Sequence, residues 1–161
     1  MRVAAFLVLL GAAVHSAAAT EAASATPATT GKPAVAAVLK DFGLFGAWAV
    51  HCAQPATPAN PHVSIIETEP GTVVERHDLG PEYESNSYSV VAAEALSKTR
   101  VSLDVVFRPG TEREERQRLI FRVVHDTRRT MYNRIENGAV VVKDGIVVGG
   151  GAHTPLLHKC G

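Results

Sequence analysis

Short runs in which apolar and polar residues alternate follow one another through the second half of the chain. In 101–107 every second residue is apolar, and in 118–123 Arg118 and Arg122 stand opposite Leu119, Phe121 and Val123. Alternation with a period of two is typical of β-strands with one buried face. The charged segment 112–118 contains good helix formers but no apolar stripe, so at most one helical turn is expected there. The pattern predicts an all-β domain.

Turn signals separate these runs at short intervals. Three dipeptides of turn residues lie between successive runs: Pro70-Gly71, Asn137-Gly138 and Asp144-Gly145. With the run 45–52 as the first strand, the chain is predicted to form eight or nine antiparallel strands in an up-and-down meander. Such a meander closes into a barrel, with a β-sandwich as the alternative. Closure would hide the sheet edges and bring the first strand beside the last.

The first forty residues differ in composition from this domain. Residues 1–19 have a positive start, an apolar run and an A-x-A cleavage pattern, which predicts a signal peptide. Residues 20–39 are mostly Ala, Thr, Ser, Pro and Gly and are expected to be a disordered leader, with a helical turn possible over 34–40. A single domain over 40–161 follows. The expected location is periplasmic or secreted, with no membrane span after cleavage.

The chain has two cysteines, Cys52 in the first predicted strand and Cys160 in the last. In an exported protein, an even and minimal number of cysteines indicates a structural disulfide. No C-x-x-C motif is present to indicate redox or metal chemistry. A Cys52–Cys160 bond is therefore predicted, and it fits a sheet whose first and last strands are neighbours.

Charge and motifs argue against several functions. The formal net charge is zero, which gives no overall attraction for nucleic acid. The histidines have no H-x-H or H-E-x-x-H spacing, and no G-x-S-x-G nucleophile motif or phosphate-binding glycine loop is present. We therefore expect a protein without metal or cofactor that is not an enzyme.

The segment Gly46-Ala47-Trp48 carries a family resemblance. It resembles the G-x-W signature of lipocalins and other calycin barrels, in which the tryptophan plugs the closed end of an eight-stranded barrel and the open end takes small apolar ligands. That resemblance also implies an arginine over Trp48, for which Arg129 and Arg134 are the candidates. Residues 45–52 are similar, too, to the opening G-x-W-x-V-x-C strand of invasion-associated locus B type periplasmic proteins. The overall style resembles uncharacterised exported proteins of proteobacteria.

Two sets of residues are candidates for binding. The first set is expected to line the barrel and contact a small apolar or amphipathic ligand: Trp48, Tyr88, Leu103, Phe107, Phe121 and Met131. The second set would share the outer face of a hairpin turning at 125–127: Arg118, Arg122, Arg128 and Tyr132. Guanidinium groups beside a tyrosine suit an envelope protein or an anionic glycan. An open interior would favour the ligand-binding hypothesis, and a filled interior would favour an interaction or inhibitor-like module.

Overall fold

The computed structural model describes residues 34–161, so the predicted signal peptide and most of the predicted leader lie outside the described residues. One helix, α1 (Val35–Asp41), precedes the sheet. The strands are β1 (Gly46–Ala49), β2 (His62–Glu69), β3 (Thr72–Asp78), β4 (Asn86–Ser97), β5 (Arg100–Phe107), β6 (Glu115–Val124), β7 (Thr127–Ile135), β8 (Val140–Lys143), β9 (Ile146–Val147) and β10 (Leu157–Cys160).

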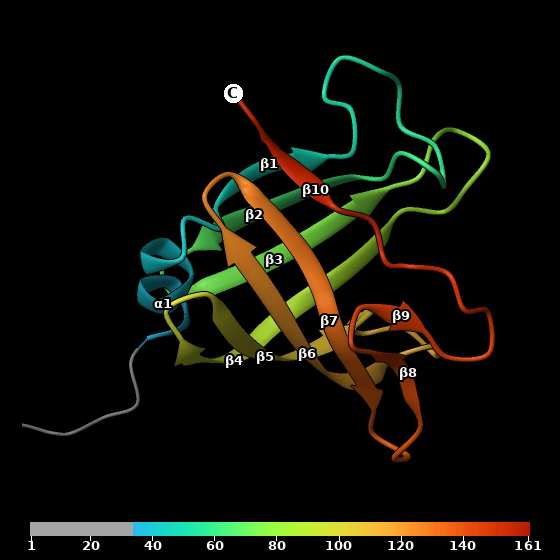
Figure 1. The fold of residues 1–161 in the computed structure, drawn as a ribbon. Coiled ribbons are helices and arrows are strands. Elements are labelled where there is room, and N and C mark those ends of the chain that lie inside the picture. Colours follow the sequence, from blue (N-terminus) through green and yellow to red (C-terminus); the bar gives the residue numbers. More distant parts are fainter. Residues whose placement is uncertain (1–33) are drawn as a thin grey trace, which may run out of the picture. The chain divides into compact units, whose positions relative to one another are not determined.

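The sheet closes into an antiparallel barrel, which confirms the predicted fold class. Strands β1 to β7 pair in sequence order, and β10 pairs with β1 on one side and with β7 on the other. The β8–β9 hairpin extends from β7 outside this closed set (Figure 1). Strand one therefore lies beside the last strand, as the meander predicted. The seam between β7 and β10 is short, because only Leu157–Arg128 and His158–Thr127 are paired.

The three predicted turns all connect neighbouring strands. Asp144 and Gly145, between β8 and β9, have φ angles of 53° and 78°, and positive φ at both central residues is what a two-residue type I′ hairpin requires. Gly138 has a φ of 90°, and the backbone N–H of Ile135 donates to Ala139. This pattern is typical of a hairpin whose turn ends in a glycine bulge.

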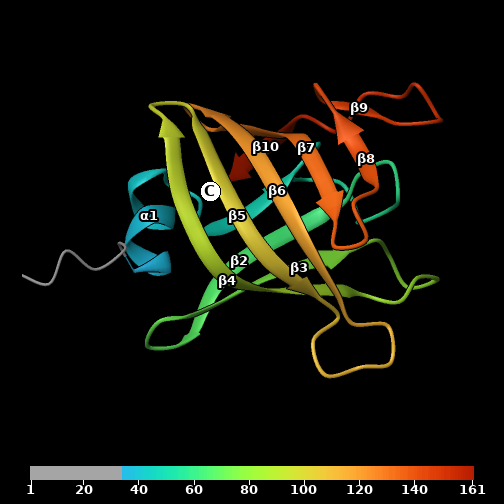
Figure 2. The same cartoon turned by 90° about the horizontal axis from the view of Figure 1, so that it is seen from below.

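The core fills the α1 end of the barrel. Figure 2 shows α1 against the end where β4 and β5 meet, and Val38 and Leu39 of the helix are buried in the core. The apolar face of α1 therefore belongs to the core, so residues 35–39 of the predicted leader are part of the folded domain. Trp48 is 1% exposed, and its indole N–H donates to the Leu44 carbonyl at 2.9 Å.

The predicted disulfide is confirmed. Cys52 and Cys160 are bonded, with their Cα atoms 5.6 Å apart and a separation of 108 positions in sequence. Ala47 of β1 pairs with Cys160 of β10, so the bond reinforces a strand pair that the sheet already makes. Within residues 34–161, no helix has the length and apolar character needed to cross a bilayer.

Candidate functional site

A buried ion pair crosses the interior of the barrel. Glu75 on β3 and Arg128 on β7 are each 3% exposed. The Arg128 guanidinium donates to both carboxylate oxygens, at 2.9 Å and 3.2 Å. Both side chains point inward because of strand register. Glu75 lies two residues after Val73, on the same buried face of β3, and Arg128 pairs with buried Val123. Two parallel hydrogen bonds fix the relative orientation of the two groups.

Two aromatic rings flank this guanidinium. The central carbon of Arg128 lies 4.8 Å from the Phe121 ring centroid and 5.5 Å from that of Trp48. The electron-rich face of an aromatic ring attracts a cation, and more strongly where water is excluded. The rings therefore offset part of the free-energy cost of burying Arg128, and they hold its guanidinium group inside the barrel.

His77 extends the charged pair toward solvent. Its Nε2 lies 2.6 Å from a carboxylate oxygen of Glu75, and its side chain is 26% exposed. The His77 ring is 5.0 Å from the Tyr88 ring, which is in turn 4.9 Å from the Phe107 ring. A row of aromatic groups thus runs from the buried carboxylate to the half-buried Phe107.

The cluster holds Glu75 as an anion. Burial alone would raise the pKa of this carboxyl, but the charge of Arg128 and the hydrogen bonds from His77 and Arg128 outweigh burial and lower the pKa from 4.5 to about 2. Because the carboxylate can only accept, Nε2 of His77 carries the proton. Burial, together with the nearby charge of Glu75, raises the pKa of the Tyr88 hydroxyl, so that group stays protonated.

This pKa predicts a dependence of stability on acid. A carboxyl whose pKa is lower in the folded state stabilises the fold above its unfolded pKa, and that stability is lost as the pH falls through the folded pKa. For Glu75 the loss should occur between pH 4.5 and about 2, and it should amount to about 3 kcal/mol. We expect the ¹³C resonance of the Glu75 carboxyl to stay constant from pH 7 to about 4, because the positive charge of Arg128 keeps the carboxyl ionised over that range. A midpoint near the ordinary glutamate value would contradict this assignment.

A cavity of about 210 Å³ opens beside the ion pair. We call it the mouth cavity. Its polar wall consists of Glu75, His77, Arg128, Arg129 and Thr130. Its apolar wall consists of Pro58, Pro61, Val63, Leu79, Pro155 and Leu157. The cavity therefore combines a predominantly apolar surface with a few convergent polar groups, which is the usual composition of a ligand site.

Three long connections supply much of the apolar wall. The β1–β2, β3–β4 and β9–β10 connections lie at the end of the barrel away from α1 (Figure 1). Buried Asn60 fixes the first connection, since its Oδ1 accepts from the His51 N–H at 2.8 Å and its Nδ2 donates to the Pro55 carbonyl at 3.0 Å. Gly80 brings the second against the first: its φ is 96°, and a Cβ there would lie 2.7 Å from the Ala56 carbonyl oxygen.

The residues predicted to line the interior lie in three different places in the structure. Trp48, Leu103 and Phe121 are buried members of the core. Tyr88 and Phe107 stack at its edge. None of these five lies among the residues around the mouth cavity.

Met131 does not line the interior. It lies in a second cavity with Arg122, Arg129 and Leu156. The pairing of β6 with β7 shifts between Ile120 and Phe121, so that Tyr132 and Thr130 take the two partners and Met131 takes none. Met131 follows outward Arg129 by two residues, so it lies on the outer side and its predicted inward orientation is wrong. The bulge returns Tyr132 to the outer face.

The predicted arginine face is correct in part. Arg118, Arg122 and Tyr132 occupy the outer register positions of β6 and β7, but Arg128 is inside the barrel. Val124 pairs with Thr127, so the turn contains only His125 and Asp126, with His125 at a φ of 51°. A turn shorter by one residue reverses the face of the side chains that follow it, and here the reversal extends to the bulge at Met131, after which Tyr132 is again on the outer face. The assignment of Arg128 to the outer face is therefore wrong.

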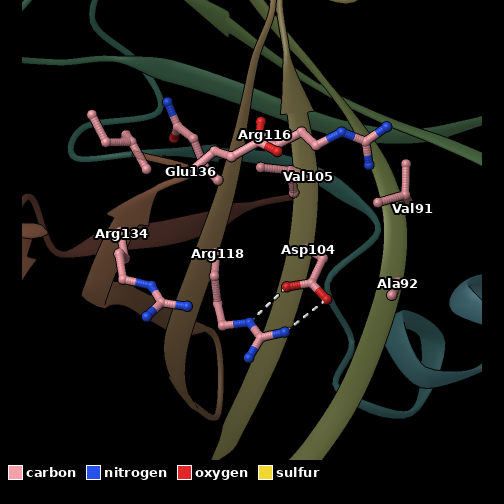
Figure 3. A pocket seen from close by; sticks show the side chains of 10 residues that line it. Val91, Ala92, Asp104, Val105, Arg116, Arg118, Arg134 and Glu136 are labelled. Carbon is pink, nitrogen blue, oxygen red and sulfur yellow. Dashed lines mark hydrogen bonds and ion pairs between the residues drawn. The ribbon is translucent and has the colours of Figure 1, made fainter. Parts of the chain in front are cut away.

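Arg118 forms an ion pair on the outer face. Its guanidinium donates to both oxygens of Asp104, at 2.7 Å and 3.0 Å, and this partner raises the pKa of Arg118. Figure 3 shows the pair in a surface groove that Arg116, Arg134 and Glu136 also line. An exposed pair of this kind contributes little to stability. Use of the face for a protein or glycan partner stays a prediction.

Two cations cover Trp48. Arg128 approaches its ring from β7, and the Nζ of Lys159 lies 5.5 Å from the ring centroid and donates to the Gly43 carbonyl at 2.7 Å. Within residues 34–161 these two, and not the predicted Arg129 or Arg134, are the cations over the indole. The resemblance at 46–48 predicted a basic group here but not its position.

The described part of the chain, 34–161, contains no group of three His, Cys, Asp or Glu side chains placed to hold a metal ion. The mouth cavity could not be predicted from the sequence, because its apolar wall comes from loop prolines and leucines without periodic spacing.

Comparison of the chain with family models, with curated proteins and with solved structures finds no match.

Proposed function

We propose that this protein is an exported, non-catalytic β-barrel that binds a small amphipathic molecule in the mouth cavity. The observation that carries the proposal is the cavity of about 210 Å³ with an apolar wall on one side and the Arg128–Glu75–His77 cluster on the other. The disulfide supports export, since such bonds persist in oxidising compartments such as the periplasm or the outside of the cell.

The chemistry of the cluster favours binding over catalysis. A carboxylate with a pKa of about 2 is a weak base at neutral pH, and both of its oxygens already accept hydrogen bonds. We infer that His77, which lines the cavity and has a side chain that is 26% exposed, contacts the polar group of the ligand. The cavity is smaller than the usual range of about 300–1,000 Å³ for ligand sites. The ligand class is therefore a compact apolar body with one hydrogen-bonding group.

A cavity-filling substitution tests this proposal. We expect 1-naphthol, a neutral ring system with one hydroxyl, to bind saturably in equilibrium dialysis. Leu79→Trp places a bulky ring in the cavity and should weaken binding about tenfold or more. Leu96→Trp is the matched control, because Leu96 is 48% exposed on β4 and does not line the cavity. Equal binding by all three proteins would remove the mouth cavity as the ligand site.

Native mass spectrometry can identify the natural ligand. We expect protein isolated from its own source to carry a bound small molecule that is lost in Leu79→Trp and retained in Leu96→Trp. A molecule retained by both variants would place the ligand elsewhere on the barrel.

A further inference from the structure

Three arginines lie side by side on the outer wall of the barrel. Arg100 of β5 pairs with Arg122 of β6, and Arg122 pairs with Arg129 of β7. We call these residues the arginine row. Directly opposed residues of neighbouring antiparallel strands have Cβ atoms about 5 Å apart, and like charges at that spacing repel. Among residues 34–161, none of the three forms a side-chain hydrogen bond or ion pair.

A second row of directly opposed residues in the same sheet contains a carboxylate beside its arginines. Asp104 of β5, Arg118 of β6 and Arg134 of β7 are also directly opposed. There Asp104 supplies an internal carboxylate, which Arg118 contacts through two hydrogen bonds (Figure 3). The arginine row has a third arginine in the place of that aspartate. Its positive charge has no counterion from the described residues.

A second observation concerns the side chain of Arg129. The Nε of Arg129 is buried and has no hydrogen-bond acceptor within the described part of the chain. A buried donor without a partner is energetically costly, and a bound anion at that position would satisfy it. This donor belongs to the same arginine that faces Arg122 across the strand pair.

The two arginines line a defined cavity. A space of about 360 Å³ lies against Arg122 and Arg129, and the remaining wall is formed by Val124, Thr127, Met131 and Leu156. The wall therefore has a cationic part and an apolar part, and Leu156 is 40% exposed at its edge. An inorganic anion would satisfy only the first part.

We propose that this outer cavity binds an oxyanion, carboxylate or phosphate, that carries an apolar chain. Two guanidinium groups in register bind the oxyanion through charge-assisted hydrogen bonds, which relieves their mutual repulsion and satisfies the Arg129 Nε. The chain lies on Val124, Met131 and Leu156. This site is separate from the mouth cavity: Arg129 contributes to both, but Arg122 lines only the outer one.

Titration with octyl phosphate tests the proposal. We expect saturable binding that shifts the Nε–H resonance of Arg129 in ¹H–¹⁵N spectra, and weaker binding of inorganic phosphate at the same resonance. Arg122→Gln should weaken octyl phosphate binding about tenfold or more. The matched control is Arg116→Gln, which removes the same charge from the outer face of the same strand and should leave affinity within about twofold.

Co-sedimentation with lipid vesicles distinguishes a lipid headgroup from a soluble amphiphile as the source of the oxyanion. Co-sedimentation with phosphatidylglycerol vesicles, but not phosphatidylcholine vesicles, that is lost in Arg122→Gln would identify a lipid headgroup. Octyl phosphate binding without such co-sedimentation would identify a soluble amphiphile. The proposal is overturned if neither phosphate shifts the Arg129 resonance, or if Arg122→Gln and Arg116→Gln weaken binding equally. Because 1-naphthol is neutral and Arg122 is outside the mouth cavity, failure of either site leaves the other test intact.

Discussion

Replacement of Cys52 and Cys160 by serine is expected to lower the free energy of unfolding by about 4–5 kcal/mol. The bond joins residues 108 apart in sequence, and removing a crosslink of that span restores much conformational freedom to the unfolded chain. For a domain of this size the midpoint of thermal unfolding should fall by roughly 15 °C. Calorimetry of the two proteins measures the difference directly.

Reductant gives the control for this variant. The wild-type midpoint should fall to that of the serine variant when dithiothreitol is present, and the variant should not respond. A wild-type midpoint that reductant leaves unchanged would show that β1 and β10 hold together without the sulfur bridge.

Arg128→Met is expected to cost about 3–5 kcal/mol of stability, because it leaves the Glu75 carboxylate buried without its counterion. Methionine retains much of the volume and the contacts with Trp48 and Phe121, so the loss reports the charge and not a cavity. Urea unfolding at neutral pH is the measurement. The control is Arg118→Met, which breaks a pair whose side chains are 51% and 37% exposed and should cost less than about 1 kcal/mol.

The double variant Glu75→Gln/Arg128→Met shows how much of the loss in stability comes from leaving the Glu75 carboxylate unpaired. Since removing both charges removes the unpaired carboxylate, we expect it to be more stable than Arg128→Met alone. A double variant that is less stable than Arg128→Met would show that Glu75 stabilises the barrel mainly through His77.

The sequence predicted well what depends on local periodicity. Alternation identified the strands with one buried face, such as 101–107, and turn dipeptides identified three of the connections between strands. The disulfide followed from the number of cysteines and the expected compartment. Closure of the sheet followed from the same meander. These features depend on neighbours in sequence, or on two residues of a rare type.

Features that depend on register were harder to predict. One residue fewer in the 125–126 turn moved Arg128 from the outer face to the interior and Met131 from the interior to the outer wall, and a bulge after Thr130 kept Tyr132 on the outer face. A period-2 pattern cannot reveal a one-residue shift when the residues on both faces are polar. The arginine row was missed for the same reason, because it appears only when Arg100, Arg122 and Arg129 are placed in pairing register.

The position of β10 has a consequence for how the chain folds. Residues 157–160 complete both the β1 and the β7 pairings, so a polypeptide that emerges from its amino end keeps one edge of β1 open until about 110 further residues have followed. Such an unprotected edge invites pairing with other chains. Rapid delivery of the whole polypeptide, or a chaperone that shields β1, would therefore limit aggregation during biogenesis.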